Sequence, residues 1–167
     1  MSELFDRELL EQASEVLRSA ERLGLRIATA ETVTGGLVAA ALTSVSGASN
    51  VFERGFVFYH RTAKAAGLGL DPAVPAEHGV VSAAVTEALA GKLLEHSTAD
   101  AGVALTGYAG PTGGNDRDPV GTVYTSAVRR GGHAVTERHL FDGDRTQVKV
   151  QAVEVALRLL GDRLGQE

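Results

Sequence analysis

Residues 25–42 read LRIATAETVTGGLVAAAL, and the pattern in this stretch guides the interpretation of the whole chain. Leu25 to Ala30 is a short, mostly apolar run, which is typical of a buried strand. Residues 37–42 are alanine and leucine apart from one valine, a composition that favours a helix. The six residues between these two segments, 31–36, include two threonines and two glycines. We therefore predict a strand, a tight turn and a helix, in this order.

Amphipathic helices are predicted at the two ends of the chain. Apolar residues recur at helical spacing from Leu9 to Ala20, and Gly24 stands where a helix C-cap is expected. A capping-box pattern at Asp144 and Gln147 predicts the start of the last helix, which we expect to end at Gly161. Between these ends, a short helix is predicted at 61–66, and residues 70–79 are expected to form a connection. A longer helix is predicted to follow, with Ser82 as its N-cap and its end at about His96.

Four further segments are rich in β-forming residues, and they are expected as strands at 51–59, 101–105, 120–128 and 134–141. Gly55 is a candidate for a bulge in the first of them, and Gly131-Gly132 is typical of a hairpin turn between the last two. Five strands interleaved with helices predict an α/β sandwich with a mixed, mostly parallel five-stranded sheet and one antiparallel strand. A chain of 167 residues suits one domain with a substantial core, and we expect residues 1–167 to form it.

The composition excludes several kinds of protein. There is no cysteine, so disulfide frameworks, thiolate nucleophiles and thiolate metal sites are ruled out. The net charge is −5 and the longest basic run is Arg129-Arg130, which argues against nucleic acid as a partner. The first six residues do not resemble a signal peptide, and no apolar segment approaches the roughly 20 residues that span a bilayer. We expect a cytoplasmic protein without a membrane partner.

Two segments follow predicted strands, where open α/β sheets collect ligands. The turn at 32–36 could present amide groups to an anion or a developing oxyanion, or it could be an ordinary capped helix start with Thr34 as N-cap. The segment from Thr106 to Pro119 contains four glycines and two prolines, and a loop of this length is usually functional or disordered. It is therefore either a binding loop or a mobile surface loop.

Tyr59 and Lys64 form a third candidate site after another strand. A lysine that is withdrawn from water, or close to a cation such as Arg54 or Arg61, can serve as a general base, whereas an isolated lysine is usually only a solvated charge. The five-residue spacing does not fit the Tyr-x-x-x-Lys pair of short-chain dehydrogenases. Phosphate-loop, dinucleotide-binding, nucleophile-elbow and zinc-protease motifs are missing, and the five histidines are scattered. We expect neither a metal nor a cofactor.

Five blocks of sequence, in order, resemble the CinA carboxy-terminal domain family. They are Ala30-Glu-Thr-Val-Thr-Gly-Gly-Leu37, Val51 to Tyr59 with Lys64 after it, His78-Gly-Val-Val-Ser82, Thr106-Gly-Tyr-Ala-Gly-Pro111 with Pro119 to Tyr124, and Phe141-Asp-Gly-Asp-Arg145. The resemblance covers roughly residues 7–161 and implies a three-layer α/β/α domain. Two-domain relatives carry an amino-terminal pyrophosphatase-type domain, for which this chain is too short.

For active members, the resemblance implies hydrolysis of nicotinamide mononucleotide to nicotinate mononucleotide and ammonia. The family nucleophile is typically a serine, and Thr32 stands at the matching position. By resemblance, Lys64 is the base, Tyr59 orients or relays the proton, and Thr106 helps to stabilise the oxyanion. The expected substrate-binding residues are Thr34, Gly35, Gly36, Gly107, Gly110, Gly113, Gly114 and, for the phosphate, Arg145.

Two hypotheses remain open at this point. The chain is either an amidohydrolase, or a nucleotide-binding module in which the change from serine to threonine has weakened or removed the chemistry. Arg145 has its own alternative, an ordinary surface charge, although an arginine at a helix start is unfavourable unless it meets an anion. A small nucleotide is the expected partner in both cases, and the resemblance also implies a homo-oligomer.

Overall fold

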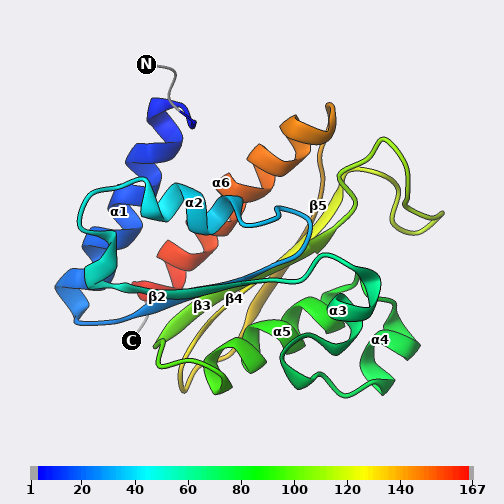
Figure 1. Ribbon diagram of the computed structural model, residues 1–167, viewed down its shortest axis with the longest axis horizontal. Coiled ribbons are helices and arrows are strands. Elements are labelled where there is room, and N and C mark those ends of the chain that lie inside the picture. The colour runs from blue at the N-terminus through cyan, green and yellow to red at the C-terminus, as the bar shows by residue number, and fades with distance from the viewer. Residues whose placement is uncertain (1–3, 166–167) are drawn as a thin grey trace.

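The computed structural model describes residues 4–165, so the first three residues of the amino-terminal segment considered above lie outside it. Six α-helices, two short 3-10 helices and five strands follow one another within these residues (Figure 1). Their bounds are α1 Arg7–Leu23, β1 Ile27–Glu31, α2 Leu37–Thr43, η1 Ala48–Asn50, β2 Phe52–Val57, α3 Arg61–Ala66, η2 Gly67–Gly69, α4 Ala73–His78, α5 Ala83–Glu95, β3 Ala101–Gly107, β4 Thr122–Arg129, β5 Val135–Leu140 and α6 Arg145–Leu164.

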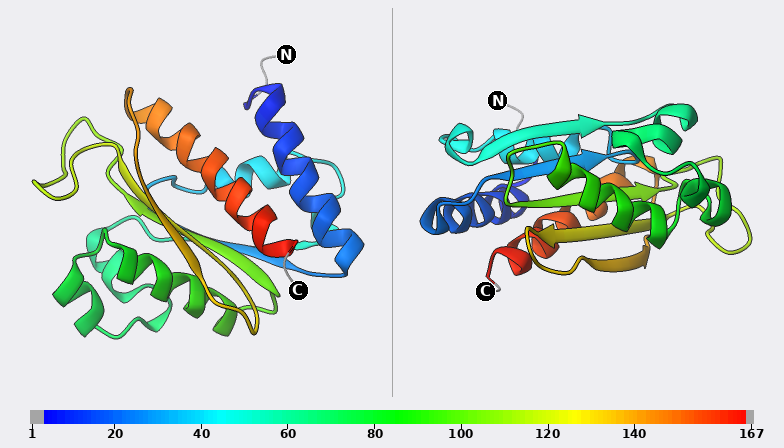
Figure 2. Two further views of the ribbon diagram at one scale, coloured as in Figure 1. Left: turned by 180° about the vertical axis from the view of Figure 1, so that it is seen from behind. Right: turned by 90° about the horizontal axis from the view of Figure 1, so that it is seen from below.

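The five strands form one sheet in the order β2-β1-β3-β4-β5. β1 runs parallel to both β2 and β3, whereas β4 is antiparallel to β3 and to β5. Four strands therefore point the same way and β4 alone is reversed, as the late hairpin predicted (Figure 2).

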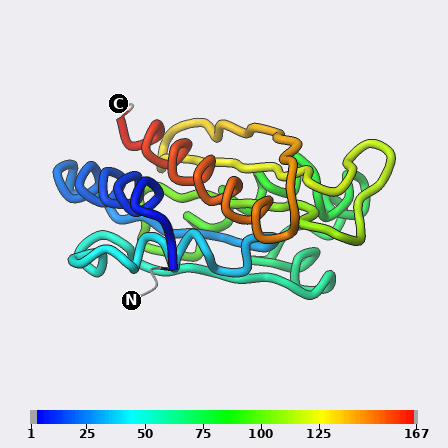
Figure 3. The backbone as a smooth tube through the Cα atoms, turned by 90° about the horizontal axis from the view of Figure 1, so that it is seen from above, coloured from blue at the N-terminus to red at the C-terminus, as the bar shows by residue number. Residues whose placement is uncertain are grey.

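Helices cover both faces of the sheet, which confirms the three-layer α/β/α architecture. Figure 1 shows α1, α2 and α6 on one face and α3, α4 and α5 on the other. In Figure 3, α1 and α6 lie side by side, and the loop between β3 and β4 projects beyond the sheet at the end where α6 begins. None of the helices within residues 4–165 combines the length and apolar character that crossing a bilayer requires.

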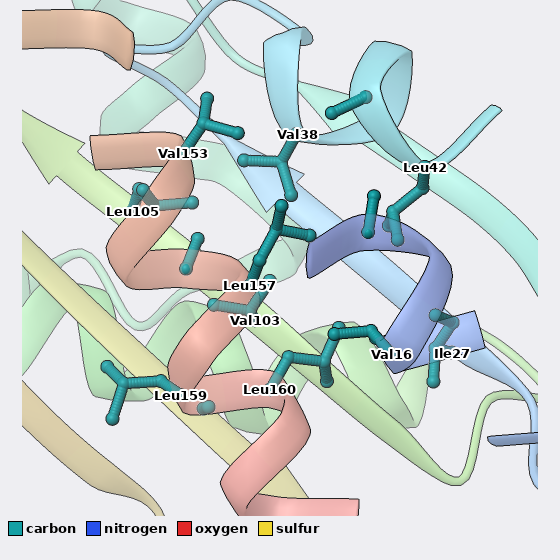
Figure 4. Packing of buried hydrophobic residues seen from close by; sticks show 14 of the residues in the cluster. Val16, Ile27, Val38, Leu42, Val103, Leu105, Val153, Leu157, Leu159 and Leu160 are labelled. Carbon is teal, nitrogen blue, oxygen red and sulfur yellow. The ribbon is translucent and has the colours of Figure 1, made fainter. Parts of the chain in front are cut away.

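The larger core lies between the sheet and the layer of α1, α2 and α6. Side chains from all three helices meet the strand residues Ile27, Val103 and Leu105 there (Figure 4). On the opposite face, the strands present small residues such as Ala28 and Ala104 to α5. α5 packs so closely that a β-carbon on Gly102 would lie 2.4 Å from the side chain of Leu93.

The predicted helix ends hold in part. Gly24 is the C-cap of α1, Ser82 caps the start of α5, and Asp144 and Gln147 form the expected capping box. The expected end of α6 at Gly161 is wrong, because the helix continues to Leu164. The Leu164 side chain is only 1% exposed, and its burial offsets the cost of about 1 kcal/mol for a glycine within a helix.

Two other predictions are corrected. The connection expected at 70–79 contains α4, in which Pro75 stands in the first turn, where its missing N–H is not needed. The bulge lies at Glu53 and not at Gly55, since Ile27 pairs with Phe52 while the next residue pairs with Arg54. A glycine is required at 55 because a β-carbon would come within 2.9 Å of the Thr29 hydroxyl.

Candidate active site

The candidate active site lies at the carboxyl ends of the parallel strands β1, β2 and β3. From β1 the chain passes through α2 to β2, and from β2 it passes over the opposite face of the sheet to β3. The order of the strands therefore reverses between β1 and β3, and ligands of open α/β sheets bind at such a point. A cavity of about 150 Å³ opens there, lined by Val33, Tyr59, Lys64, Gly107, Tyr108, Ala109, Gly110, Thr112 and Arg145.

Three of the predicted site residues make direct contact in this cavity. The Lys64 ammonium lies 5.3 Å from the centroid of the Tyr59 ring, within the range of a cation–π interaction. Arg145 donates one hydrogen bond to the carbonyl oxygen of Gly110, at 2.7 Å, and another to the Tyr59 hydroxyl. Residues from α3, from the segment before it, from the loop after β3 and from α6 thus converge on one hollow.

Local structure explains how Tyr59 and Lys64 meet. His60 caps α3 by accepting a hydrogen bond from the amide of Thr62, which starts the helix directly after Tyr59. About one turn of helix then returns Lys64 over the aromatic ring. Tyr59 stays 50% exposed, so the cavity is open to water on this side.

Thr32 is placed next to this cavity but does not line it. Its side chain is completely buried, and its hydroxyl donates a hydrogen bond of 2.9 Å to the carbonyl oxygen of Leu105 on β3. Val33, the next residue, contributes to the cavity wall instead. A reaction at the Thr32 oxygen therefore requires the hydroxyl to turn away from Leu105.

Glu31 organises the turn, a role that was not predicted from the sequence. Its carboxylate is completely buried and accepts hydrogen bonds from the Thr34 hydroxyl at 2.7 Å and from the amides of Val38 and Ala39 at 2.8 and 3.1 Å. Thr34 is therefore not the N-cap of α2; Gly36 occupies that position. An acidic residue at the end of an apolar strand, directly before hydroxyl residues and glycines, was the available signal.

Thr106 belongs to a chain of buried hydroxyls. Its Oγ1 lies 2.8 Å from that of Thr86, which in turn donates to the carbonyl oxygen of Ser82 at 2.6 Å. Because a threonine hydroxyl has a single proton, Thr106 must be the donor to Thr86. In this arrangement its proton is directed to α5 and not to a guest in the cavity.

The predicted glycines divide into two groups. Gly107 and Gly110 line the cavity. Gly35 and Gly36 form the turn before α2, and Gly113 and Gly114 shape the outer part of the loop; all four have positive φ. At Gly114 a β-carbon would lie 2.7 Å from the amide nitrogen of Val120, so this glycine allows the two arms of the loop to approach each other.

The loop after β3 is held by a buried carboxylate. Asp118 is completely buried and accepts hydrogen bonds from the Tyr124 hydroxyl at 2.8 Å and from Nε of Arg138 and of Arg117, each at 3.1 Å. Burial opposes ionisation, but the three hydrogen bonds outweigh it and hold the pKa of Asp118 below its usual value. Burial, together with the hydrogen bond to Asp118, raises the pKa of Tyr124.

The chain resembles known proteins over nearly its whole length. The model of the CinA C-terminal domain matches residues 9–164. Nicotinamide-nucleotide amidohydrolase PncC of Escherichia coli strain K12 is 40% identical over 155 residues, which cover 93% of this chain and 94% of that protein. A CinA-like protein of Myxococcus xanthus is 41% identical over 152 residues, which cover 91% of this chain and 36% of that protein.

A solved structure agrees with these matches. The competence/damage inducible protein CihA from Agrobacterium tumefaciens superposes with a TM-score of 0.93 at 37% identity, covering 99% of this chain and 100% of that one. Together these findings confirm the expected family and the expected class of enzyme, an amidohydrolase. The chain belongs to the CinA C-terminal domain family.

Proposed function

We propose that this protein hydrolyses the carboxamide of nicotinamide mononucleotide, giving nicotinate mononucleotide and ammonia. The observation that carries the proposal is the lining of the cavity, in which Arg145 supplies a guanidinium beside the proposed base Lys64 and no residue supplies a carboxylate. Such a site favours a guest that bears a phosphate. The likeness to Escherichia coli PncC supports the same substrate.

In the proposed mechanism, Thr32 is the nucleophile and Lys64, in its neutral form, the base. The Thr32 oxygen bonds to the carboxamide carbon while its proton passes to Lys64, with Tyr59 orienting or relaying it. The tetrahedral intermediate collapses, the C–N bond breaks, and the nitrogen takes up the proton and leaves as ammonia. Water then cleaves the resulting ester, which restores the Thr32 hydroxyl and releases the carboxylic acid.

The size of the cavity suggests how the substrate is oriented. Small-molecule pockets typically measure about 300–1,000 Å³, so a hollow of about 150 Å³ holds only part of a nucleotide. The carboxamide must reach Thr32, and therefore the ring enters the hollow. We assign the phosphate to Arg145, which is exposed at the edge of the cavity, and the ribose to Gly107 at the end of β3 and Gly110 in the loop after it.

One observation favours the alternative, a nucleotide-binding module with weak or no catalysis. The Thr32 hydroxyl is already bonded to the Leu105 carbonyl oxygen, and its methyl group restricts rotation of the side chain. A serine at the same position would turn more easily. The two functions therefore differ in whether the natural protein, with the methyl group in place, turns over the substrate.

Ammonia release from nicotinamide mononucleotide separates the two functions. For the enzyme, we expect turnover by wild type, equal or faster turnover by Thr32→Ser, and a loss of about 10³-fold or more in Thr32→Ala. Lys64→Ala should lose about 10²–10⁴-fold, as expected for a general base. Thr98→Ala and Lys92→Ala, which change surface residues remote from the cavity, are the matched controls.

Each result has a definite meaning. An inert wild type together with an active Thr32→Ser variant would show that the natural protein is a binding module. Wild-type turnover that survives in Thr32→Ala would exclude Thr32 as the nucleophile.

A further inference from the structure

The outer part of the loop after β3 forms a compact turn. The Asn115 side-chain oxygen accepts hydrogen bonds from the amides of Arg117 and Asp118, at 3.0 and 2.9 Å. The amide of Asn115 donates in return to the carbonyl oxygen of Asp118, at 2.9 Å. Residues 115–118 are thus closed by three short contacts.

The Asp118 carboxylate attaches this turn to the sheet. Its partners are Tyr124 on β4 and Arg138 on β5, in addition to Arg117 beside it in the chain. Arg138 donates a second hydrogen bond to the carbonyl oxygen of Arg117, and Arg117 donates one to the carbonyl oxygen of His78 at the end of α4. One buried carboxylate therefore stands at the centre of contacts with three elements.

Val120, two residues after this turn, is in direct contact with the cavity wall. A β-carbon on Gly110 would lie 2.5 Å from Cγ1 of Val120, so Val120 packs directly against the backbone of Gly110. The Gly110 carbonyl oxygen is in turn the acceptor for Arg145. A path of contacts thus runs from Asp118 along two residues of chain to Val120, and from there through Gly110 to Arg145.

We propose that Asp118 is a positioning residue, which fixes the turn at 115–118 and the chain from there to Val120, so that Gly110 and Arg145 are set in place to receive the substrate before it arrives. The proposal rests on the proposed function, because it concerns how the same cavity binds its nucleotide. Preorganisation of this kind lowers the entropy cost of binding. Loss of the Asp118 carboxylate should therefore weaken substrate binding more than it slows the chemistry.

The test compares wild type with Asp118→Asn, and with Asp116→Asn as a control that removes an exposed charge from the same loop. For nicotinamide mononucleotide hydrolysis, we expect Asp118→Asn to raise KM about tenfold while kcat changes less than about twofold. Asp116→Asn should leave both unchanged. Trypsin should cut Asp118→Asn after Arg117 faster than wild type, and saturating nucleotide should slow that cut.

If trypsin cuts Asp118→Asn faster than wild type but KM is unchanged, Asp118 has only a structural role. A decrease in kcat without a rise in KM would also overturn the proposal. Should Asp118→Asn fail to fold, as judged by circular dichroism, Tyr124→Phe removes one of the three hydrogen bonds and must still raise KM. If wild type binds nicotinamide mononucleotide without hydrolysing it, the dissociation constant measured by calorimetry replaces KM. A wild type that neither binds nor hydrolyses it overturns the proposed function, and this inference with it.

Discussion

Among single residues, Glu31 connects the end of β1 to the start of α2. Its two carboxylate oxygens accept hydrogen bonds from the hydroxyls of Thr29 and Thr34 and from two backbone amides of α2. The turn that carries Thr32 and Val33 lies between the residues that these contacts join. The Glu31 carboxylate therefore determines the position of Thr32, the proposed nucleophile, although Glu31 itself does not line the cavity.

Replacing Glu31 with glutamine should destabilise the protein strongly. The new amide group would point a donor at other donors, and hydrogen bonds to a charged group contribute about 1.5–3 kcal/mol. We expect the free energy of unfolding of Glu31→Gln, measured in urea, to fall by about 3 kcal/mol. Glu87→Gln, at an exposed position on α5, should change it by less than about 0.5 kcal/mol. Equal stabilities for the two variants would contradict this role.

At the scale of elements, two glycines show how the same residue type serves opposite purposes. Gly24 ends α1 with φ +67°, a left-handed conformation that other residues adopt only at a cost. Gly161 lies within α6, where a β-carbon would be 3.6 Å from the Val16 side chain, at ordinary van der Waals distance.

Alanine should therefore have opposite effects at these two positions. We expect Gly161→Ala to raise the free energy of unfolding by about 0.5–1 kcal/mol, because alanine favours the helix and adds a contact with α1. Gly24→Ala should lower it by about 1 kcal/mol. Thermal and urea unfolding of both variants, in parallel with wild type, measure the difference. A destabilised Gly161→Ala would mean that α1 and α6 have no room for the methyl group.

The elements that were predicted correctly carry their signals within a few residues. Ser82 caps α5, and Asp144 and Gln147 cap α6, because side chain and backbone partners lie in the same turn. α4 was not predicted, although proline is tolerated in the first turn of a helix, where Pro75 stands. The length of α6 was underestimated because the burial of Leu164 depends on other elements.

The same distinction applies to the candidate site. Tyr59 and Lys64 could be identified together because they lie only five positions apart. The contact between Arg145 and Gly110 joins residues 35 positions apart, and that between Thr106 and Thr86 joins residues 20 apart. Which partner a hydroxyl or a guanidinium selects depends on how the layers pack, and no local pattern contains that information.

At the scale of the whole molecule, the charge of the chain and the charge of the cavity have opposite signs. The chain carries a net charge of −5, whereas the cavity lining contains the Arg145 guanidinium and no carboxylate. A negatively charged nucleotide is therefore repelled by the molecule at long range and attracted at the site. Salt at 0.1 M screens charges over about 10 Å, so it affects the long-range repulsion and the attraction at the cavity differently.

Substitution of Arg145 tests whether the attraction at the cavity acts on a phosphate. We expect Arg145→Gln to raise KM for nicotinamide mononucleotide about tenfold, since one charge-assisted hydrogen bond is worth about 1.5–3 kcal/mol. KM for nicotinamide riboside, which lacks the phosphate, should hardly change. Arg18→Gln, on the exposed side of α1, alters the net charge equally and should leave both values as in wild type. If both substrates lose affinity equally in Arg145→Gln, the guanidinium acts by holding Tyr59 and Gly110 in place and not by binding the phosphate.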